Sequence, residues 1–258
     1  MKRKGFVLDV VANNIPYRPN FQTGWGNACL IRGPGCAVLF DTGGDGDSLL
    51  QNLEEVGISP SGIKYVVVSH EHDDHTGGLW AFLQANRKAL VFAPASFSQA
   101  FRSRVRAAGA RLVSVKGPGR ICEGVYSTGE MRGRKWEQSL ALRTAQGLVI
   151  LTGCAHPGIA NIVERCVRVL KDKPHLALGG FHLKDVPGSE IDGVIARLRK
   201  TGLDRVAPNH CTGASASRRI RAAWGEGFIE TGCGASLTIA GASPPITAIR
   251  IPVPDHAL

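Results

Sequence analysis

The residue types best suited to chemistry are concentrated in one stretch of six residues. Three histidines are interleaved there with three acidic residues, in the order His70, Glu71, His72, Asp73, Asp74 and His75. Imidazole and carboxylate groups are the usual protein ligands of Zn²⁺ and Fe²⁺. Packing these six side chains together would be unfavourable without a cation to satisfy them. The stretch therefore predicts a site for one or two metal ions, which would acidify a bound water and polarise a substrate oxygen.

Further candidate residues lie where the chain leaves short apolar runs. The runs cover residues 37–40, 65–68, 148–151, 176–178 and 205–207, and the chemistry-bearing residues that follow them are Asp41, His70, His156, His182 and His210. Helical patterns, for example at 159–170 and 214–224, alternate with these runs. This alternation is typical of buried strands covered by helices. We therefore expect an α/β fold whose strand ends bring these side chains together.

Length and composition fit one large α/β domain over residues 1–258. Hydrophobic residues make up 43% of the chain and charged residues 20%, as in ordinary globular proteins. No stretch reaches the roughly 18 consecutive apolar residues of a membrane-spanning helix. The basic start at 1–4 is not followed by the long apolar region of a secretion signal. We therefore expect a cytoplasmic location. Seven cysteines without a C-x-x-C pair argue against a disulfide framework.

The net charge of +10 is concentrated in the middle of the chain. A basic insert at about 96–144 holds ten basic against three acidic residues, which leaves +7. One interpretation is a cap that attracts an anionic small-molecule substrate, and another is a solvated basic surface. Nucleic-acid binding is a third, but the segment contains few aromatic residues and no known nucleic-acid-binding motif. No partner other than a small-molecule substrate is expected, and the oligomeric state is left open.

The motif His-x-His-x-Asp-His at 70–75 resembles the signature of the metallo-β-lactamase superfamily. The resemblance implies an α/β, four-layer αββα sandwich with a two-metal site where its two sheets meet. It also implies two ligand sets, which are His70, His72 and His156 for one ion and Asp74, His75 and His210 for the other. Asp74 would also orient the nucleophile as the catalytic residue, and Asp41 would hold a ligand imidazole by its second nitrogen. Zn²⁺ is the expected metal, with Fe²⁺ or Mn²⁺ as alternatives.

One motif departs from the superfamily pattern. After the Gly179-Gly180 turn, where most members carry a bridging aspartate, this chain has Phe181 and His182. His182 could be a neutral metal ligand if the backbone turns its ring inward, and it could instead contact substrate or pack in the core. Losing one negative charge would weaken the second metal site. Whether the site holds one ion or two is therefore left open.

Three short sequence motifs near the predicted ligands indicate a narrower branch of the superfamily. Residues 152–159, 179–183 and 209–213 resemble the branch of dihydropterin-ribofuranosylaminobenzene phosphate synthases of methanopterin biosynthesis and their uncharacterised bacterial relatives. In that branch histidine replaces the fourth-motif aspartate. The leading hypothesis for function is a hydrolase-like, metal-dependent enzyme acting on an anionic small molecule. The alternative is a C–N bond-forming transferase acting on a pterin-like substrate, and a nuclease is a weaker third hypothesis.

Several residues near the predicted ligands have simpler interpretations. Cys154 and Cys211 flank predicted ligands, and we expect them to be small buried side chains beneath the site rather than sulfur ligands. Trp25 is a candidate for a pocket wall but is expected to pack in the core. The helix predicted after Gly213 would turn its positive end toward an anionic group. The tail from Gly241 is expected to be an extended edge strand or a loose end.

Overall fold

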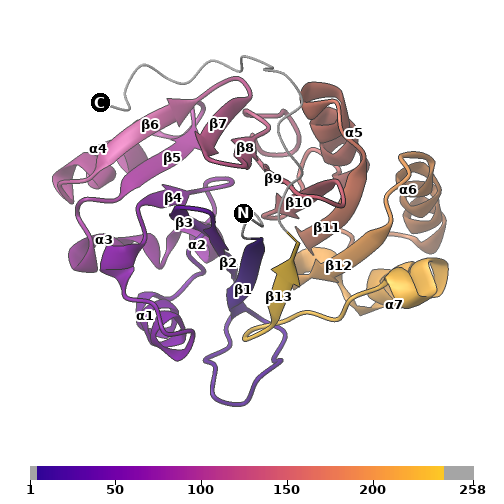
Figure 1. The fold of residues 1–258 in the computed structure, drawn as a ribbon, viewed down its shortest axis with the longest axis horizontal. Coiled ribbons are helices and arrows are strands. Elements are labelled where there is room, and N and C mark those ends of the chain that lie inside the picture. Colours follow the sequence, from indigo (N-terminus) through magenta and orange to yellow (C-terminus); the bar gives the residue numbers. More distant parts are fainter. Residues whose placement is uncertain (1–4, 241–258) are drawn as a thin grey trace.

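The computed structural model describes residues 5–240, so the basic start and the tail from Gly241 lie outside the described residues. The described chain forms two sheets (Figure 1). The first sheet has the order β13-β1-β2-β3-β4-β5-β6. Its strands are β1 (Phe6–Asn13), β2 (Asn27–Gly33), β3 (Cys36–Phe40), β4 (Tyr65–Val67), β5 (Leu90–Pro94), β6 (Arg111–Val115) and β13 (Ser236–Ile239).

The second sheet has the order β12-β11-β10-β9-β8-β7. Its strands are β7 (Gly119–Cys122), β8 (Val125–Ser127), β9 (Leu140–Arg143), β10 (Leu148–Thr152), β11 (Pro174–Gly180) and β12 (Arg205–Asn209). The α-helices are α1 (Gly46–Glu55), α2 (Asp73–Thr76), α3 (Leu79–Ala85), α4 (Gln99–Ala107), α5 (Ile159–Leu170), α6 (Gly188–Lys200) and α7 (Ala214–Trp224). Short 3-10 turns cover Pro60–Gly62, His210–Thr212 and Gly225–Gly227.

Three buried apolar clusters hold four layers together. The central cluster lies between the sheets and joins side chains such as Phe40 of β3 and Leu151 of β10. A second cluster packs α1, α3 and α4 on the outer face of the first sheet, and a third packs α5, α6 and α7 on the second. Figure 1 shows these helices on opposite flanks of the paired sheets. The fold is therefore the αββα sandwich that the motifs implied.

The parallel strands of each sheet end at the same edge. β3, β4, β5 and β6 run parallel in the first sheet, and β10, β11 and β12 do so in the second. All five residues of β10 are buried, as expected for a strand covered on both faces. In open α/β sheets, binding sites form at the carboxyl ends of such strands. The candidate residues after β3, β4, β10, β11 and β12 all lie at these ends.

A disulfide connects the two sheets, although the spacing of the cysteines had argued against a disulfide framework. It joins Cys36 of β3 to Cys122 of β7, which lie 86 residues apart in sequence. Their wide spacing gave no sign of the pair, because only the packing of one sheet on the other brings them together. The other five cysteines are free and buried.

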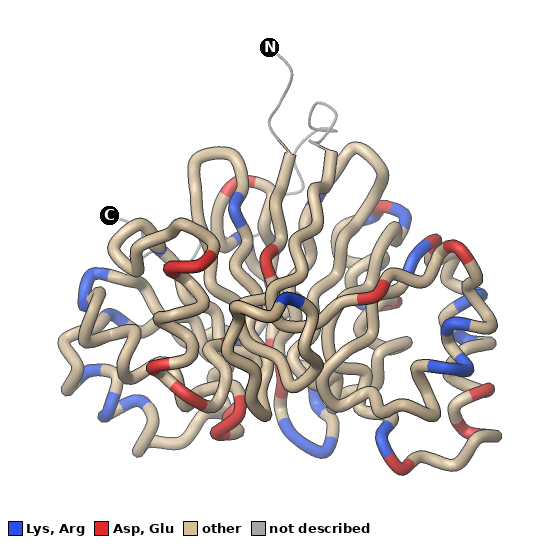
Figure 2. Tube along the Cα trace, turned by 90° about the horizontal axis from the view of Figure 1, so that it is seen from below, with Lys and Arg blue, Asp and Glu red and all other residues tan. Residues whose placement is uncertain are grey.

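The basic segment 96–144 contributes to both sheets. It supplies α4 and β6 on one side and β7, β8 and β9 on the other, and the loop between β8 and β9 reaches the histidine cluster. Figure 2 shows Lys and Arg spread over both flanks of the molecule rather than gathered on one face. Within residues 5–240, no helix is long and apolar enough to cross a membrane.

Candidate metal centre

The first group of ligand atoms comes from His70, His72 and His156. His70 and His72 follow β4, His156 follows β10, and their ligand atoms all lie within 4.8 Å of one another. His70 Nε2 lies 3.0 Å from His72 Nδ1, and the rings of His70 and His156 are 4.5 Å apart. The group therefore takes two imidazoles from one sheet and one from the other.

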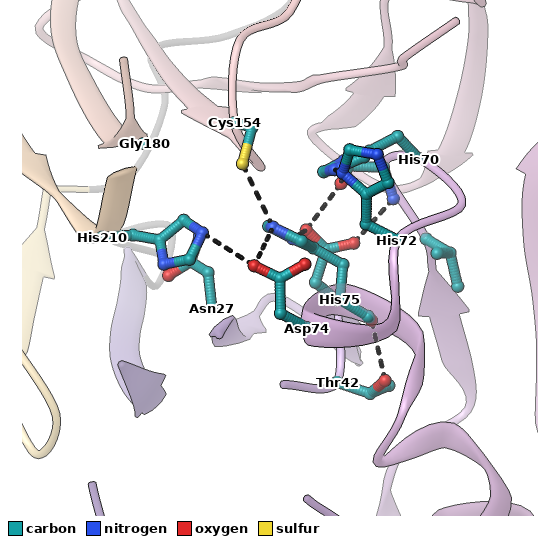
Figure 3. Close-up of polar contacts among 12 residues, drawn as sticks. Asn27, Thr42, His70, His72, Asp74, His75, Cys154, Gly180 and His210 are labelled. Atoms are coloured by element: carbon teal, nitrogen blue, oxygen red, sulfur yellow. Dashed lines mark hydrogen bonds and ion pairs between the residues drawn. The ribbon is translucent and has the colours of Figure 1, made fainter. Parts of the chain in front are cut away.

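The second group consists of Asp74, His75 and His210, shown in Figure 3. Asp74 Oδ2 lies 3.6 Å from His75 Nε2 and 3.3 Å from His210 Nε2. His75 and His210 are buried, and His210 Nε2 makes no hydrogen bond within the described chain. This group, too, combines two residues of the first sheet with one residue of the second.

Asp41 holds one histidine from each group, directly or through Ser69. Its Oδ2 accepts hydrogen bonds from His75 Nδ1 at 2.8 Å and from the Ser69 hydroxyl at 2.7 Å. The Ser69 oxygen lies 2.9 Å from His70 Nδ1 and can accept its hydrogen. In their neutral forms, both imidazoles then present unprotonated Nε2 atoms to the site. Such outer partners fix the tautomer and the orientation of a metal-binding histidine.

Two other residues hold the ligand imidazoles of the second sheet by their Nδ1 atoms. Glu137 Oε2 lies 2.9 Å from His156 Nδ1, and Asn14 Oδ1 lies 2.9 Å from His210 Nδ1. A neutral histidine that donates through Nδ1 has only a lone pair on Nε2. The Nε2 atom of His210 and the carboxylate of Asp74 therefore face each other as two acceptors. A bound cation would relieve this contact, so the residues present fit a divalent metal.

Burial and neighbouring charges set the protonation states that a metal site requires. Burial and the nearby His75 and His156 hold the pKa of His70 well below its ordinary value, so this imidazole is neutral. Burial alone would raise the pKa of Asp74, but the proximity of His210 and His75 lowers it to about 2. Asp74 is therefore an anion at neutral pH. Metal ions bind such neutral imidazoles and ionised carboxylates.

His182 is brought to the same site by an unusual backbone conformation. It follows β11 with φ +53°, and its ring lies 4.5 Å from the ring of His156. Its Nδ1 is buried without a hydrogen-bond partner within the described chain, and its ligand atom lies within 4.8 Å of those of Cys154 and His156. Phe181, in contrast, packs in the core beneath the second sheet's helices. The inward turn on which a ligand role for His182 depended is present.

Left-handed backbone geometry recurs around the site. Among described non-glycine residues with positive φ, Asp41, Ala155, His182 and His210 all lie at the histidine cluster. This conformation is unfavourable for residues with a side chain and persists only where the surrounding structure enforces it. The strand ends thus adopt strained turns that direct these side chains inward.

The sequence patterns missed three residues that support the ligands. Glu137 was counted only as a charge in the basic segment, yet it is 1% exposed and contacts three consecutive residues, 154–156. Asn14 lies 196 residues from His210, and Ser69 was seen only as the start of the motif. No spacing rule links the first two to their partners. The one available signal was that Glu137 is one of two acidic residues in the loop between β8 and β9, inside the basic segment.

The rim of the site carries cations and an exposed aromatic ring. Burial lowers the pKa of His72, and the charge of Lys135 contributes in the same direction. The pKa of His182 is raised, chiefly by its hydrogen bond with Cys211, and the charge of Arg134 opposes this rise. Trp25 is 53% exposed and its ring lies 5.0 Å from that of His210, so the expectation that it packs in the core is wrong. Lys184 Nζ lies 5.3 Å from the centre of the Trp25 ring.

The fold and the histidine cluster define a class of protein. The family model of the metallo-beta-lactamase superfamily matches residues 24–158, and the chain belongs to this superfamily. It is 28% identical over 236 residues to the 7,8-dihydropterin-6-methyl-4-(beta-D-ribofuranosyl)-aminobenzene-5'-phosphate synthase of Methanocaldococcus jannaschii, a match covering 74% of this chain and 80% of the synthase. An uncharacterized protein of the same archaeon is 24% identical over 246 residues, covering 83% of this chain and 93% of that protein.

A solved structure supports the same assignment of fold. A metal-dependent hydrolase of the beta-lactamase superfamily superposes with a TM-score of 0.75 at 24% sequence identity. The match covers 91% of this chain and 99% of the hydrolase. The superfamily and branch resemblance seen in the sequence motifs is therefore confirmed.

Proposed function

We propose that this protein is a metal-dependent enzyme, hydrolase-like in mechanism, that acts on an anionic small molecule. The observation that carries the proposal is the meeting of two groups of ligand atoms, each drawn from both sheets. In the proposal, His70, His72 and His156 hold one ion, while Asp74, His75 and His210 hold the other. Zn²⁺ is the metal that best suits these donors, and Fe²⁺ and Mn²⁺ are alternatives.

The protein's own residues would orient the reactants. When bound, the metal supplies Lewis acidity toward a substrate oxygen and makes water a better nucleophile near neutral pH. Asp74 stays ionised because its pKa is about 2, so its carboxylate can accept a hydrogen bond from the attacking water and aim it. Asp41, Glu137 and Asn14 hold the imidazoles so that the site does not reorganise during the reaction.

The charge of the rim supports an anionic substrate. Arg134, Lys135 and Lys184 are exposed, and the first two lie close enough to affect the histidines electrostatically. A positively charged entrance raises the local concentration of anions and speeds their association. Phosphate or carboxylate groups are the expected anions.

The experiment that tests this proposal compares two adjacent aspartates. Asp74 lies in the second ligand group, whereas Asp73 is exposed and belongs to none of the candidate groups found within residues 5–240. Purified wild-type protein and the Asp74→Asn and Asp73→Asn variants would be analysed for bound metal by elemental mass spectrometry. Turnover would then be measured on phosphoesters, lactones, thioesters and pterins with the identified metal restored.

We expect Asp74→Asn to lose turnover and metal, and Asp73→Asn to keep both. Full metal and full activity in Asp74→Asn would end the proposal. A charge reversal of Arg134 and Lys135 to glutamate should raise KM for anionic substrates, with an effect that shrinks as salt is added. The same reversal should leave KM for a neutral lactone unchanged.

A pterin-type transferase is the second candidate, and the rim of the site favours it. Trp25 offers an exposed aromatic face beside His210, and Lys184 lies over the same ring. Such a pair could stack a planar aromatic substrate and attract its anionic group. The similarity to the archaeal synthase supports the same substrate class. Salt-sensitive binding of a pterin phosphate that is lost in Trp25→Ala would favour transfer, whereas turnover of simple phosphoesters alone would favour hydrolysis.

A further inference from the structure

The sulfur of Cys154 lies in the middle of the candidate metal centre. Its Sγ is 3.3 Å from His75 Nε2, a contact visible in Figure 3. The structure also places this sulfur within 4.8 Å of ligand atoms from both groups and from their neighbours. These residues are His70, His75, His156, His182, His210 and Cys211. No other side chain described here belongs to as many candidate ligand groups.

The position of Cys154 does not suit the packing role expected from the sequence. Cys29 and Cys166 each belong to an apolar cluster, whereas Cys154 belongs to none of the three clusters of residues 5–240. Its backbone N–H donates to Glu137 Oε1 at 3.1 Å, and the next residue, Ala155, has φ +60°. Its backbone is therefore held in place while the side chain contacts imidazoles.

A second observation points to a ligand at this place. His210 Nε2 is an unpartnered nitrogen on a side chain with 0% exposure, and the ligand atom of His210 lies within 4.8 Å of the Cys154 sulfur. Of the six residues in the two main ligand groups, only Asp74 is an anion. Two divalent ions in a buried site would leave most of their charge unbalanced. A thiolate is both an anion and a strong ligand of Zn²⁺.

We propose that Cys154 binds metal through its thiolate and bridges the two ligand groups. The thiol proton is released to solvent as the sulfur–metal bond forms. The sulfur then supplies the negative charge that a histidine at position 182 cannot provide. This inference rests on the metal-dependent function proposed above. Cys211, which belongs to only one candidate group, lies outside the proposed coordination shell.

X-ray absorption spectroscopy of the zinc-loaded protein tests the proposal. Bound sulfur gives a Zn–S distance of about 2.3 Å, well separated from Zn–N and Zn–O distances of about 2.0–2.2 Å. We expect one sulfur neighbour per zinc in the wild-type protein and in Cys211→Ser, the matched control. Cys154→Ser should lose that sulfur shell. Cys154→Asp should keep metal through its carboxylate, again without sulfur. Among the cobalt-loaded proteins, only the wild type and Cys211→Ser should show the sulfur-to-cobalt charge-transfer absorption band.

The outcomes separate this proposal from the one on which it rests. If the wild-type protein binds zinc and turns over substrate without any sulfur shell, the proposal that Cys154 is a thiolate ligand is refuted and the proposed function stays intact. A sulfur shell that survives in Cys154→Ser, or is lost in Cys211→Ser, would assign the ligand to the other thiol. A wild-type protein that binds no metal would refute both proposals. The wild-type spectrum decides the matter even if a Cys154 variant does not fold.

Discussion

The buried carboxylate of Glu137 allows the support of the metal centre to be tested without touching a ligand. Its Oε1 accepts hydrogen bonds from the backbone N–H groups of Cys154 and Ala155, at 3.1 and 2.9 Å. Its Oε2 accepts from the backbone N–H of His156 at 2.8 Å and from His156 Nδ1 at 2.9 Å. One side chain thus fixes both the loop after β10 and the orientation of a ligand imidazole.

Glu137→Gln keeps the shape but replaces one accepting oxygen by an NH₂ group. Whichever way the amide is turned, its nitrogen faces two N–H donors that then lose their acceptor. Each buried donor left unsatisfied costs about 1–3 kcal/mol, so the free energy of unfolding should fall by roughly 2–6 kcal/mol. Loss of an outer partner of a metal-binding histidine should weaken metal affinity by about 10–100-fold.

Urea unfolding followed by circular dichroism, and metal titration against a competing chelator, measure the two effects. Glu123→Gln is the matched control, because Glu123 is exposed and belongs to the same basic segment. Its unfolding free energy should change by less than about 0.5 kcal/mol. The reasoning fails if Glu137→Gln and Glu123→Gln cannot be told apart in both measurements.

The pH dependence of stability provides an independent check on Glu137. Burial alone would raise its pKa, but the hydrogen bond from His156 and the neighbouring backbone donors lower it below the ordinary value of 4.5. A carboxylate whose pKa is lower in the folded state stabilises the fold above its unfolded pKa and loses that effect as pH falls through the folded value. The stability difference between metal-free wild-type protein and Glu137→Gln should therefore narrow below about pH 4.5. A difference that stays constant on acidification would contradict this account.

Three further changes have expected outcomes. Gly133→Ala would place a Cβ 2.3 Å from the backbone oxygen of His156, so the loop must shift. We expect the free energy of unfolding in urea to fall by about 1–3 kcal/mol and metal binding to weaken. An unchanged metal affinity would count against this contact. Phe82→Ala empties a fully buried site in the apolar cluster that packs α1, α3 and α4 on the first sheet, and should lower the unfolding free energy by about 3–5 kcal/mol, with metal content per folded molecule unchanged. Alkylation of the air-oxidised, denatured protein should modify five cysteines, and seven after reduction of Cys36–Cys122; seven without reductant would refute the disulfide.

The sequence was sufficient to predict the parts of the site that follow local rules. The cluster at 70–75 is a run of adjacent ligands, and His156 and His210 follow strands that hydrophobic patterns identify. The helix after Gly213 begins at Ala214, where φ +80° at the glycine requires a residue without a side chain. Strand ends, helix starts and ligand spacing are all encoded within a few residues.

The supporting contacts could not be predicted, because they depend on how the two sheets pack. Glu137 reaches residues 154–156 across a loop, and Asn14 reaches His210 from the other sheet. Trp25 was expected in the core, since large aromatic residues are usually well buried, yet it is half exposed beside His210. Nothing in the local sequence distinguishes these residues from ordinary polar or core positions.

The geometry of the ligand groups makes the metal centre a property of the whole sandwich. Each group takes two residues from the end of β4 and one from the second sheet, His156 in one case and His210 in the other. Neither sheet alone can therefore present a complete group. Asp41 contacts one ligand of each group through His75 and Ser69, so the two groups also share a common support. An ion bound at either group would hold the sheets together, and packing of the central cluster would in turn set the distance between its ligands.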